Sequence, residues 1–169
     1  MGSLANETSK KEAFVSEAAL VEQFMALLRE GVSPWGDLLT TTEWDYRTGI
    51  TDVLARTADG QLVAFEAKLT DWRRASHQAY RNTTFAGRVY VVMPTRAAER
   101  TRAHEALFAR YGIGLCSVDA DRIRVLIEAP DTEPLLPWLH KRAHSYFDKV
   151  ASDHGDQPRR GRSRSMQTA

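Results

Sequence analysis

The sequence predicts an α/β protein in which a central mixed β-sheet is flanked by helices. Apolar segments with helical spacing alternate along the chain with short extended segments. An Asp-Gly turn signal at residues 59–60 indicates an antiparallel hairpin, whereas a helical segment between two apolar strands indicates a parallel crossover. A chain of 169 residues has the length of one domain, and we expect a single domain over residues 1–150.

The first half of the chain predicts one helix and then three strands. Residues 12–30 carry apolar side chains at helical spacing and end before Gly31, as an amphipathic helix would. Two extended segments follow over residues 38–46 and 50–57, and a third, over residues 61–69, comes after the turn signal. These strands are expected to pair as hairpins.

The second half predicts helices and strands in alternation. Thr70 or Asp71 is the expected cap of the next helix, because both have side-chain oxygens that accept from free N–H groups. The expected elements are a helix over 71–85, a strand over 88–93, a helix over 95–111, strands over 114–118 and 123–128, and a helix over 133–150.

Charged residues interrupt the third strand, where the sequence is otherwise apolar. Glu66 and Lys68 share one face of this strand because side chains alternate. A two-residue turn would set Glu66 against Val53, whereas a three-residue loop ending in a left-handed Gly60 would set it against Asp52. We predict the three-residue loop, because it keeps apolar and polar side chains on separate faces and a one-residue slip would mix them.

Two facing carboxylates repel each other and need a cation between or beside them. Mg²⁺ prefers oxygen ligands, and Asp52, Glu66 and the Ala67 carbonyl would provide three. Lys68 would then orient or deprotonate the attacking water, or stabilise the charged phosphate. The alternative is a structural ion pair between Lys68 and either Asp52 or Glu66, because short patterns of charge recur by chance.

The motif residues resemble those of the PD-(D/E)xK nuclease superfamily, which has the restriction-endonuclease-like fold, and the resemblance spans residues 12–94. The matching residues are Thr51-Asp52 on one strand, Glu66-Ala67-Lys68 on the next, and Gln78 on the following helix. Glu17 is the better match to a glutamate that often accompanies them in the first helix, with Glu22 second. Thr51 departs from the family by replacing the proline before the aspartate, a residue that is not a ligand.

The resemblance implies a restriction-endonuclease-like core and metal-dependent hydrolysis of phosphodiester bonds by an endodeoxyribonuclease. It implies Mg²⁺ as cofactor, with Mn²⁺ as a substitute, held by Asp52, Glu66 and Ala67. It also implies that Gln78 and Glu17 support the site. Along the helix after Lys68, Arg74, Gln78 and Arg81 share one face, and these arginines with Arg73 would contact the nucleic-acid backbone; the alternative is a solvated helix face with incidental arginines.

Other polar residues are weaker candidates. Glu43 is either a supporting carboxylate beside Asp52 or an exposed strand residue. His140 and His144 have a spacing that can bind zinc, but we expect an exposed helix pair because no acidic or cysteine partner is evident nearby. Cys116 lies in an apolar strand and is expected to be a buried, inert thiol.

The charge of the chain is unevenly distributed. Residues 151–169 are expected to form a disordered tail, whose arginines would be solvated or would add non-specific phosphate contacts. One cysteine excludes an intramolecular disulfide, and the first residues lack the apolar segment of a secretory signal, so we expect a cytoplasmic protein without a membrane partner.

The expected partner is therefore nucleic acid, with DNA favoured, and a homodimer or larger protein assembly is left open. Two alternatives to an active nuclease remain. The same fold would serve as a catalytically weak nucleic-acid-binding protein, or as an assembly subunit of a defence or mobile-element system.

Overall fold

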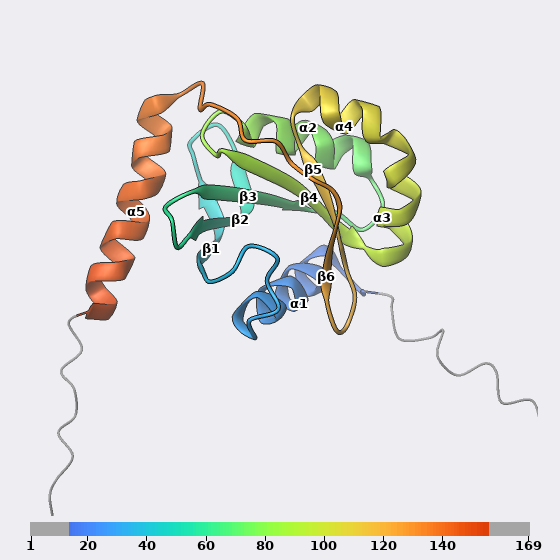
Figure 1. Cartoon of the computed structure of the whole chain (residues 1–169), viewed down its shortest axis with the longest axis horizontal. Helices are drawn as coiled ribbons and strands as arrows, with labels where there is room; N and C mark the ends of the chain where they lie inside the picture. The colour runs from blue at the N-terminus through green and yellow to red at the C-terminus, as the bar shows by residue number, and fades with distance from the viewer. Residues whose placement is uncertain (1–13, 156–169) are drawn as a thin grey trace, which may run out of the picture.

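Six strands form one sheet in which the order in space is the order in sequence (Figure 1). The computed structural model describes residues 14–155. The strands are β1 (Leu38–Asp45), β2 (Ile50–Thr57), β3 (Leu62–Ala67), β4 (Arg88–Pro94), β5 (Gly114–Val118) and β6 (Ile123–Ile127). The helices are α1 (Glu17–Arg29), α2 (Trp72–Asn82), α3 (Thr95–Thr101), α4 (Glu105–Tyr111) and α5 (Pro137–Gly155), with a short 3₁₀ helix η1 (Arg102–His104) between α3 and α4.

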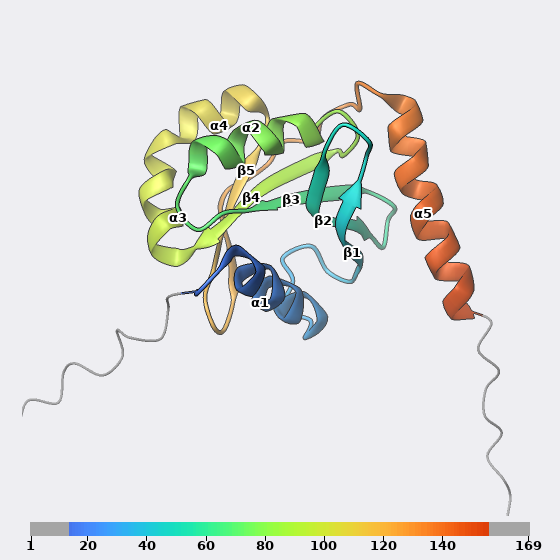
Figure 2. The same ribbon diagram turned by 180° about the vertical axis from the view of Figure 1, so that it is seen from behind.

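The sheet is mixed, as predicted. β1, β2 and β3 pair antiparallel, β3, β4 and β5 pair parallel, and β6 returns antiparallel to β5. Parallel neighbours require crossovers, which α2 and the α3–η1–α4 segment supply. Figures 1 and 2 show α1 on one face of the sheet and α2, α3 and α4 on the other, which confirms the α/β class.

The β2–β3 hairpin has the predicted register. Val53 pairs with Phe65 and Ala55 with Val63. The Thr57 N–H donates to the Gln61 carbonyl at 2.9 Å, which closes a three-residue loop. Its last residue, Gly60, has φ +88°, a left-handed conformation that glycine adopts without steric cost.

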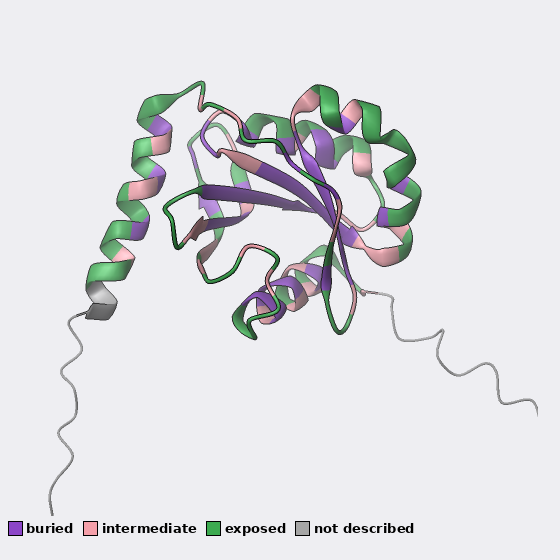
Figure 3. Ribbon diagram, in the orientation of Figure 1, coloured by how far each residue is buried: buried purple, intermediate pink, exposed green. Residues whose placement is uncertain are grey.

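Two apolar clusters cover the faces of the sheet, and β3, β5 and all of β4 except its two end residues are buried (Figure 3). On the α1 face, Phe24 packs edge-on against Phe65 with ring centroids 4.9 Å apart. On the α2 face, Leu54 and Ala64 pack with Ala75 and Ala79. Both faces of β3 are therefore apolar as far as Phe65, and the predicted polar face of this strand begins only at Glu66.

Side-chain hydrogen bonds set the ends of α1 and α2. The Ser16 and Asp71 side chains accept from N–H groups of the first turns at 3.1 Å, so Asp71 is the predicted cap of α2. α2 ends at Asn82, earlier than predicted. The hydroxyls of Thr83 and Thr84 donate back to the Tyr80 and Arg81 carbonyls at 2.6 and 2.8 Å, and such bonds compete with the helix.

The helix predicted over residues 95–111 is wrong as a single element. It is divided into α3, η1 and α4, and the Trp72 ring stacks on His104 at the division, with centroids 4.0 Å apart. The division lets α3 pack against β4 and β5 while α4 packs against α2 and β5. Sequence periodicity alone does not record this change of direction.

The last helix differs from its predicted range, since it begins at Pro137 and continues to Gly155. Proline suits a first helical position because its missing N–H would have no partner there. Leu139, Ala143 and Phe147 pack into the cluster on the α2 face, and Arg56 on β2 pairs with Asp148 at 2.7 Å. The arginines of the predicted tail lie outside the described residues. None of the helices within residues 14–155 is long and apolar enough to cross a membrane.

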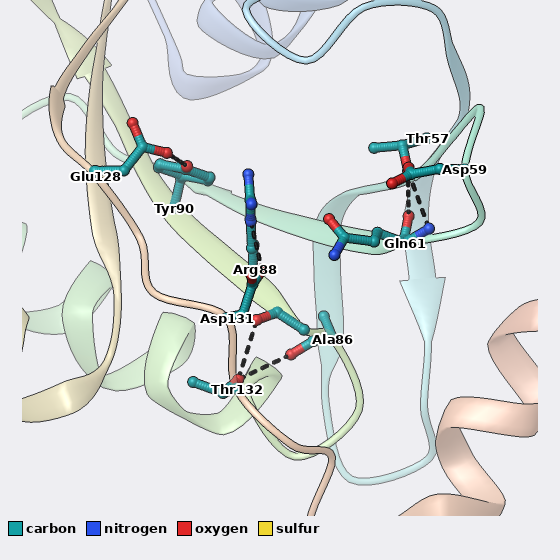
Figure 4. A network of polar contacts seen from close by, with 10 residues as sticks. Thr57, Asp59, Gln61, Ala86, Arg88, Tyr90, Glu128, Asp131 and Thr132 are labelled. Carbon is teal, nitrogen blue, oxygen red and sulfur yellow. Dashed lines mark hydrogen bonds and ion pairs between the residues drawn. The ribbon is translucent and has the colours of Figure 1, made fainter.

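Polar contacts fasten the segment after β6 to the start of β4 (Figure 4). The Tyr90 hydroxyl donates to Glu128 at 2.6 Å, and Arg88 pairs with Asp131 at 2.6 Å. The Thr132 N–H donates to the Gly87 carbonyl at 2.7 Å. Because Arg88 pairs with Val63 at the start of β3, the contacts of Gly87 and Arg88 lie at the opposite end of the parallel strands from Glu66.

We predict that Gly114→Ala destabilises the fold. A Cβ at Gly114 would lie 2.5 Å from both the Tyr90 ring and the Ile127 carbonyl oxygen, and overpacking of this kind costs about 1–3 kcal/mol. The measurement is urea unfolding. Gly87→Ala is the matched control, because its nearest neighbour is 3.7 Å away. Equal stability of the two variants would contradict this prediction and would show that the backbone of β5 and β6 shifts to accommodate the added methyl group.

Candidate active site

The predicted site residues Asp52, Glu66 and Lys68 lie together at one edge of the sheet. Asp52 is near the start of β2, and Glu66 is near the end of the antiparallel β3. The register places the two carboxylates opposite each other. The Ala67 N–H donates to Asp52 Oδ2 at 2.8 Å, so the backbone of β3 holds the Asp52 side chain directly.

Glu66 is a buried carboxylate, with only 2% of its surface exposed. Its pKa is raised from 4.5 to about 8, first because burial disfavours the charged form and second because Asp52 lies beside it. The Asn82 side chain, which donates to Glu66 Oε1 at 2.7 Å, lowers this pKa in part. Lys68 lowers it further through its positive charge.

Lys68 forms an ion pair with Glu17 in the first turn of α1, at 2.8 Å. The alternative from the sequence, a direct ion pair of Lys68 with Asp52 or Glu66, is not the pairing that the structure shows. The Lys68 side chain is 16% exposed, against 46% for Glu17. Glu17 therefore holds the ammonium group close to Glu66 without neutralising the two strand carboxylates.

A groove of about 400 Å³ opens between α1 and the start of β2. It is lined by Glu17, Ala18, Val21, Glu22, Met25, Arg29, Thr42, Glu43 and Asp52. Both glutamates that were candidates in the first helix, Glu17 and Glu22, thus border the same space as Asp52.

Glu43 is exposed on β1 and faces this groove. The β1–β2 register pairs Thr42 with Val53 and Trp44 with Thr51, so Glu43 stands opposite Asp52. Its φ is 52°, in the left-handed region that non-glycine residues adopt only at a cost of about 1–3 kcal/mol. Glu43 is therefore both exposed and next to the carboxylate pair.

The α2 residues predicted to contact nucleic acid are exposed. Arg73, Arg74 and Arg81 all reach solvent, and the Arg73 guanidinium lies 4.6 Å from the centroid of the Trp72 ring. Gln78 is half-buried, and its Oε1 is buried without a hydrogen-bond partner among the described residues. A buried acceptor of this kind can accept a hydrogen bond from water or from a ligand.

The sequence did not point to Asn82. This residue is fully buried at the end of α2, one turn after Gln78, and it contacts Glu66. The Thr51 hydroxyl donates to Asn82 Oδ1 at 3.2 Å, so the position that departs from the family's proline has a partner of its own. The available signal was a polar residue at helical spacing from the apolar Ala75 and Ala79.

The remaining candidates lie in other surroundings. His140 and His144 are half-buried rather than exposed, because His140 Nδ1 bonds to the Phe85 carbonyl at 2.9 Å and the two rings are 4.6 Å apart. Cys116 is buried, as predicted, and burial raises the pKa of its thiol. Within residues 14–155, no three acidic, histidine or cysteine side chains are grouped as a metal site. The predicted set of two carboxylates and the Ala67 carbonyl stays a prediction.

Comparisons with known proteins identify a solved structure that shares the fold of this protein. No protein-family model matches the chain, and comparison with curated protein sequences finds no significant match. The SPO1766 protein of unknown function from Silicibacter pomeroyi superposes with a TM-score of 0.58 at 16% identity, over 84% of this chain and 90% of that one. The two proteins therefore have the same fold, and this likeness leaves the function open.

Two nuclease structures are similar at lower scores. A repair endonuclease from Pyrococcus abyssi has a TM-score of 0.44 at 20% identity, over 64% of this chain, and EndoMS in the EndoMS–dsDNA2 complex has a TM-score of 0.45 at 20% identity, over 69% of this chain. This chain spans half the length of each.

We predict that Glu66 makes the protein less stable as the pH rises. Its folded-state pKa of about 8 lies above the ordinary 4.5, so the native state binds more protons between these values and loses stability through this window. Urea unfolding of wild type and Glu66→Gln in EDTA, from about pH 5 to about pH 9, measures the effect. Wild type should lose stability relative to Glu66→Gln, and parallel profiles would contradict the burial argument.

Proposed function

We propose that this protein is a metal-dependent nuclease of the PD-(D/E)xK type that hydrolyses phosphodiester bonds in DNA as an endonuclease. The observation that carries the proposal is the facing pair Asp52 and Glu66 at one sheet edge, with the Lys68 ammonium beside them. Two carboxylates and one lysine at a strand edge are the parts that hydrolysis of a phosphodiester needs: oxygen ligands for a cation, and a donor near the reacting water.

Asp52 and Glu66, with the Ala67 carbonyl, would hold Mg²⁺, and Mn²⁺ would substitute for it. The donor set fits, because all three ligands are oxygens and because the Asp52 carboxylate raises the pKa of Glu66, as expected when two acids share a site without a cation between them. When bound, the ion would supply Lewis-acid polarisation of a phosphate oxygen.

Lys68 would orient the attacking water through its N–H donors. Glu17 supports this role, since its carboxylate holds the ammonium at 2.8 Å and removes rotamers that point away from the site. The Gln78 NH₂ group would donate to a phosphate oxygen, or its buried, unpartnered Oε1 would accept from the attacking water. Glu17 would thus position the Lys68 ammonium, and Gln78 would position the water or the phosphate.

The exposed arginines of α2 would bind the phosphate backbone. Arg73, Arg74 and Arg81 are guanidinium groups on the helix that follows Lys68, and such groups pair with phosphate oxygens through two parallel hydrogen bonds. They balance the acidic groove on the α1 side, where Glu22 and Glu43 would repel a phosphate. Nucleic acid is therefore expected to approach from the α2 side.

The proposal predicts divalent-dependent cutting by wild type that is lost in Asp52→Ala and Lys68→Ala. The assay compares duplex, single-stranded and branched DNA with RNA, each in Mg²⁺, Mn²⁺ or EDTA. Removal of a group that acts on the reacting water lowers the rate by about 10²–10⁴-fold. Lys141→Ala is the matched control, because Lys141 is exposed on α5.

The outcomes of this assay separate the proposal from its alternatives. Cutting that survives in EDTA or in Asp52→Ala would contradict the metal site. Binding of nucleic acid by wild type without any cutting would favour the catalytically weak binding protein. Absence of both would leave only the fold.

We predict that Arg74→Ala and Arg81→Ala weaken DNA binding across all sequences. Each lost phosphate contact should reduce the slope of log affinity against log salt by about one. Fluorescence anisotropy over a salt series measures the slope in EDTA, where no cutting competes. Arg124→Ala is the control, since Arg124 is exposed on β6, the outermost strand on the side of the sheet away from β1. An equal effect of all three variants would place the binding surface elsewhere.

A further inference from the structure

A buried chain of hydrogen bonds connects β2, α2 and β3 behind the carboxylate pair. The Thr51 hydroxyl donates to Asn82 Oδ1 at 3.2 Å, and Asn82 Nδ2 donates to Glu66 Oε1 at 2.7 Å. Thr51 and Asn82 are fully buried, and Glu66 is 2% exposed. The chain therefore links three elements through side chains that water does not reach.

The Asn82 amide has a hydrogen-bond partner on each side. An asparagine amide has an acceptor on one side and a donor on the other. Thr51 donates to the oxygen side, so the NH₂ group is presented to Glu66. When Glu66 is ionised, as it would be with a cation bound, reversing the amide would place two acceptor oxygens against each other in a buried site, which is unfavourable.

We propose that Asn82, oriented by Thr51, is the positioning residue for Glu66. It commits Oε1 to the protein and leaves Oε2 as the oxygen that binds the divalent cation together with Asp52. This inference rests on the proposed metal-dependent function and adds the group that holds the ligand. Partners that orient a metal ligand from behind typically change metal affinity by about 10–100-fold when they are removed.

The location of this chain of hydrogen bonds supports a role at the site. Thr51 directly precedes Asp52 on β2, and Asn82 follows Gln78 by one turn of α2. The surrounding face of α2 is otherwise formed by small side chains such as Ala75 and Ala79, which pack without polar partners. Asn82 is thus a buried polar residue whose hydrogen bonds run to Glu66 and to the neighbour of Asp52.

The test is Mn²⁺ binding by the full chain without nucleic acid, measured by calorimetry and by electron paramagnetic resonance. Asn82→Leu removes the donor at similar volume, and Thr51→Val removes only the hydroxyl. Each should weaken Mn²⁺ binding about tenfold or more. Thr51→Ser, which keeps the hydroxyl, should bind within about twofold of wild type, since the hydrogen bond that orients Asn82 is retained.

Ser76→Ala is the matched control for a change in buried polarity on α2. Ser76 is fully buried and its hydroxyl donates to the Arg73 carbonyl at 2.8 Å, within the helix itself. This variant should bind Mn²⁺ as wild type does. If Asn82→Leu does not fold, as judged by circular dichroism and cooperative unfolding, Thr51→Val carries the test.

Two failures are distinguishable. Wild-type affinity for Mn²⁺ in folded Thr51→Val and Asn82→Leu would overturn the positioning role and leave the proposed nuclease in place. No Mn²⁺ binding by wild type would contradict the proposed function and this inference with it. An equal loss in Ser76→Ala would show a general effect of α2 packing and would also overturn the inference.

Discussion

The register of the β2–β3 hairpin is the constraint on which the candidate site depends. Side chains alternate along a strand, so a slip of one residue would turn Asp52 away from Glu66 and turn Val53 toward it. The three-residue loop ending in the left-handed Gly60 sets this register. A backbone conformation at the far end of the hairpin thus determines which side chains meet at the site.

Burial on both faces of the sheet gives Glu66 its chemical character. The apolar clusters under α1 and α2 extend along β3 to the residues that flank Glu66, so Glu66 has little contact with water. A carboxylate in such surroundings is charged only when nearby donors and cations stabilise it. Asn82 and Lys68 provide part of that stabilisation, and the pKa of about 8 shows that it is incomplete.

The sequence could predict the hairpin and the facing carboxylates because both follow from local patterns. Gly60 and the alternation around Glu66 are visible within twenty residues, and they determine register and face. The contacts between Lys68 and Glu17, and between Asn82 and Glu66, join residues 51 and 16 positions apart. Such contacts depend on how α1 and α2 cross the sheet, as does the left-handed Glu43, and no local pattern records that packing.

The pairing of Lys68 with Glu17 bears on what the two strand carboxylates need. Had Lys68 bonded directly to Asp52 or Glu66, one cation would have served the pair and the site would be a structural ion cluster. Instead the ammonium has its own carboxylate at 2.8 Å on α1, while Asp52 is held by a backbone N–H and Glu66 by an amide. Neutral donors hold the pair without balancing its charge. The cation proposed for Asp52 and Glu66 would supply the positive charge that these neutral donors lack.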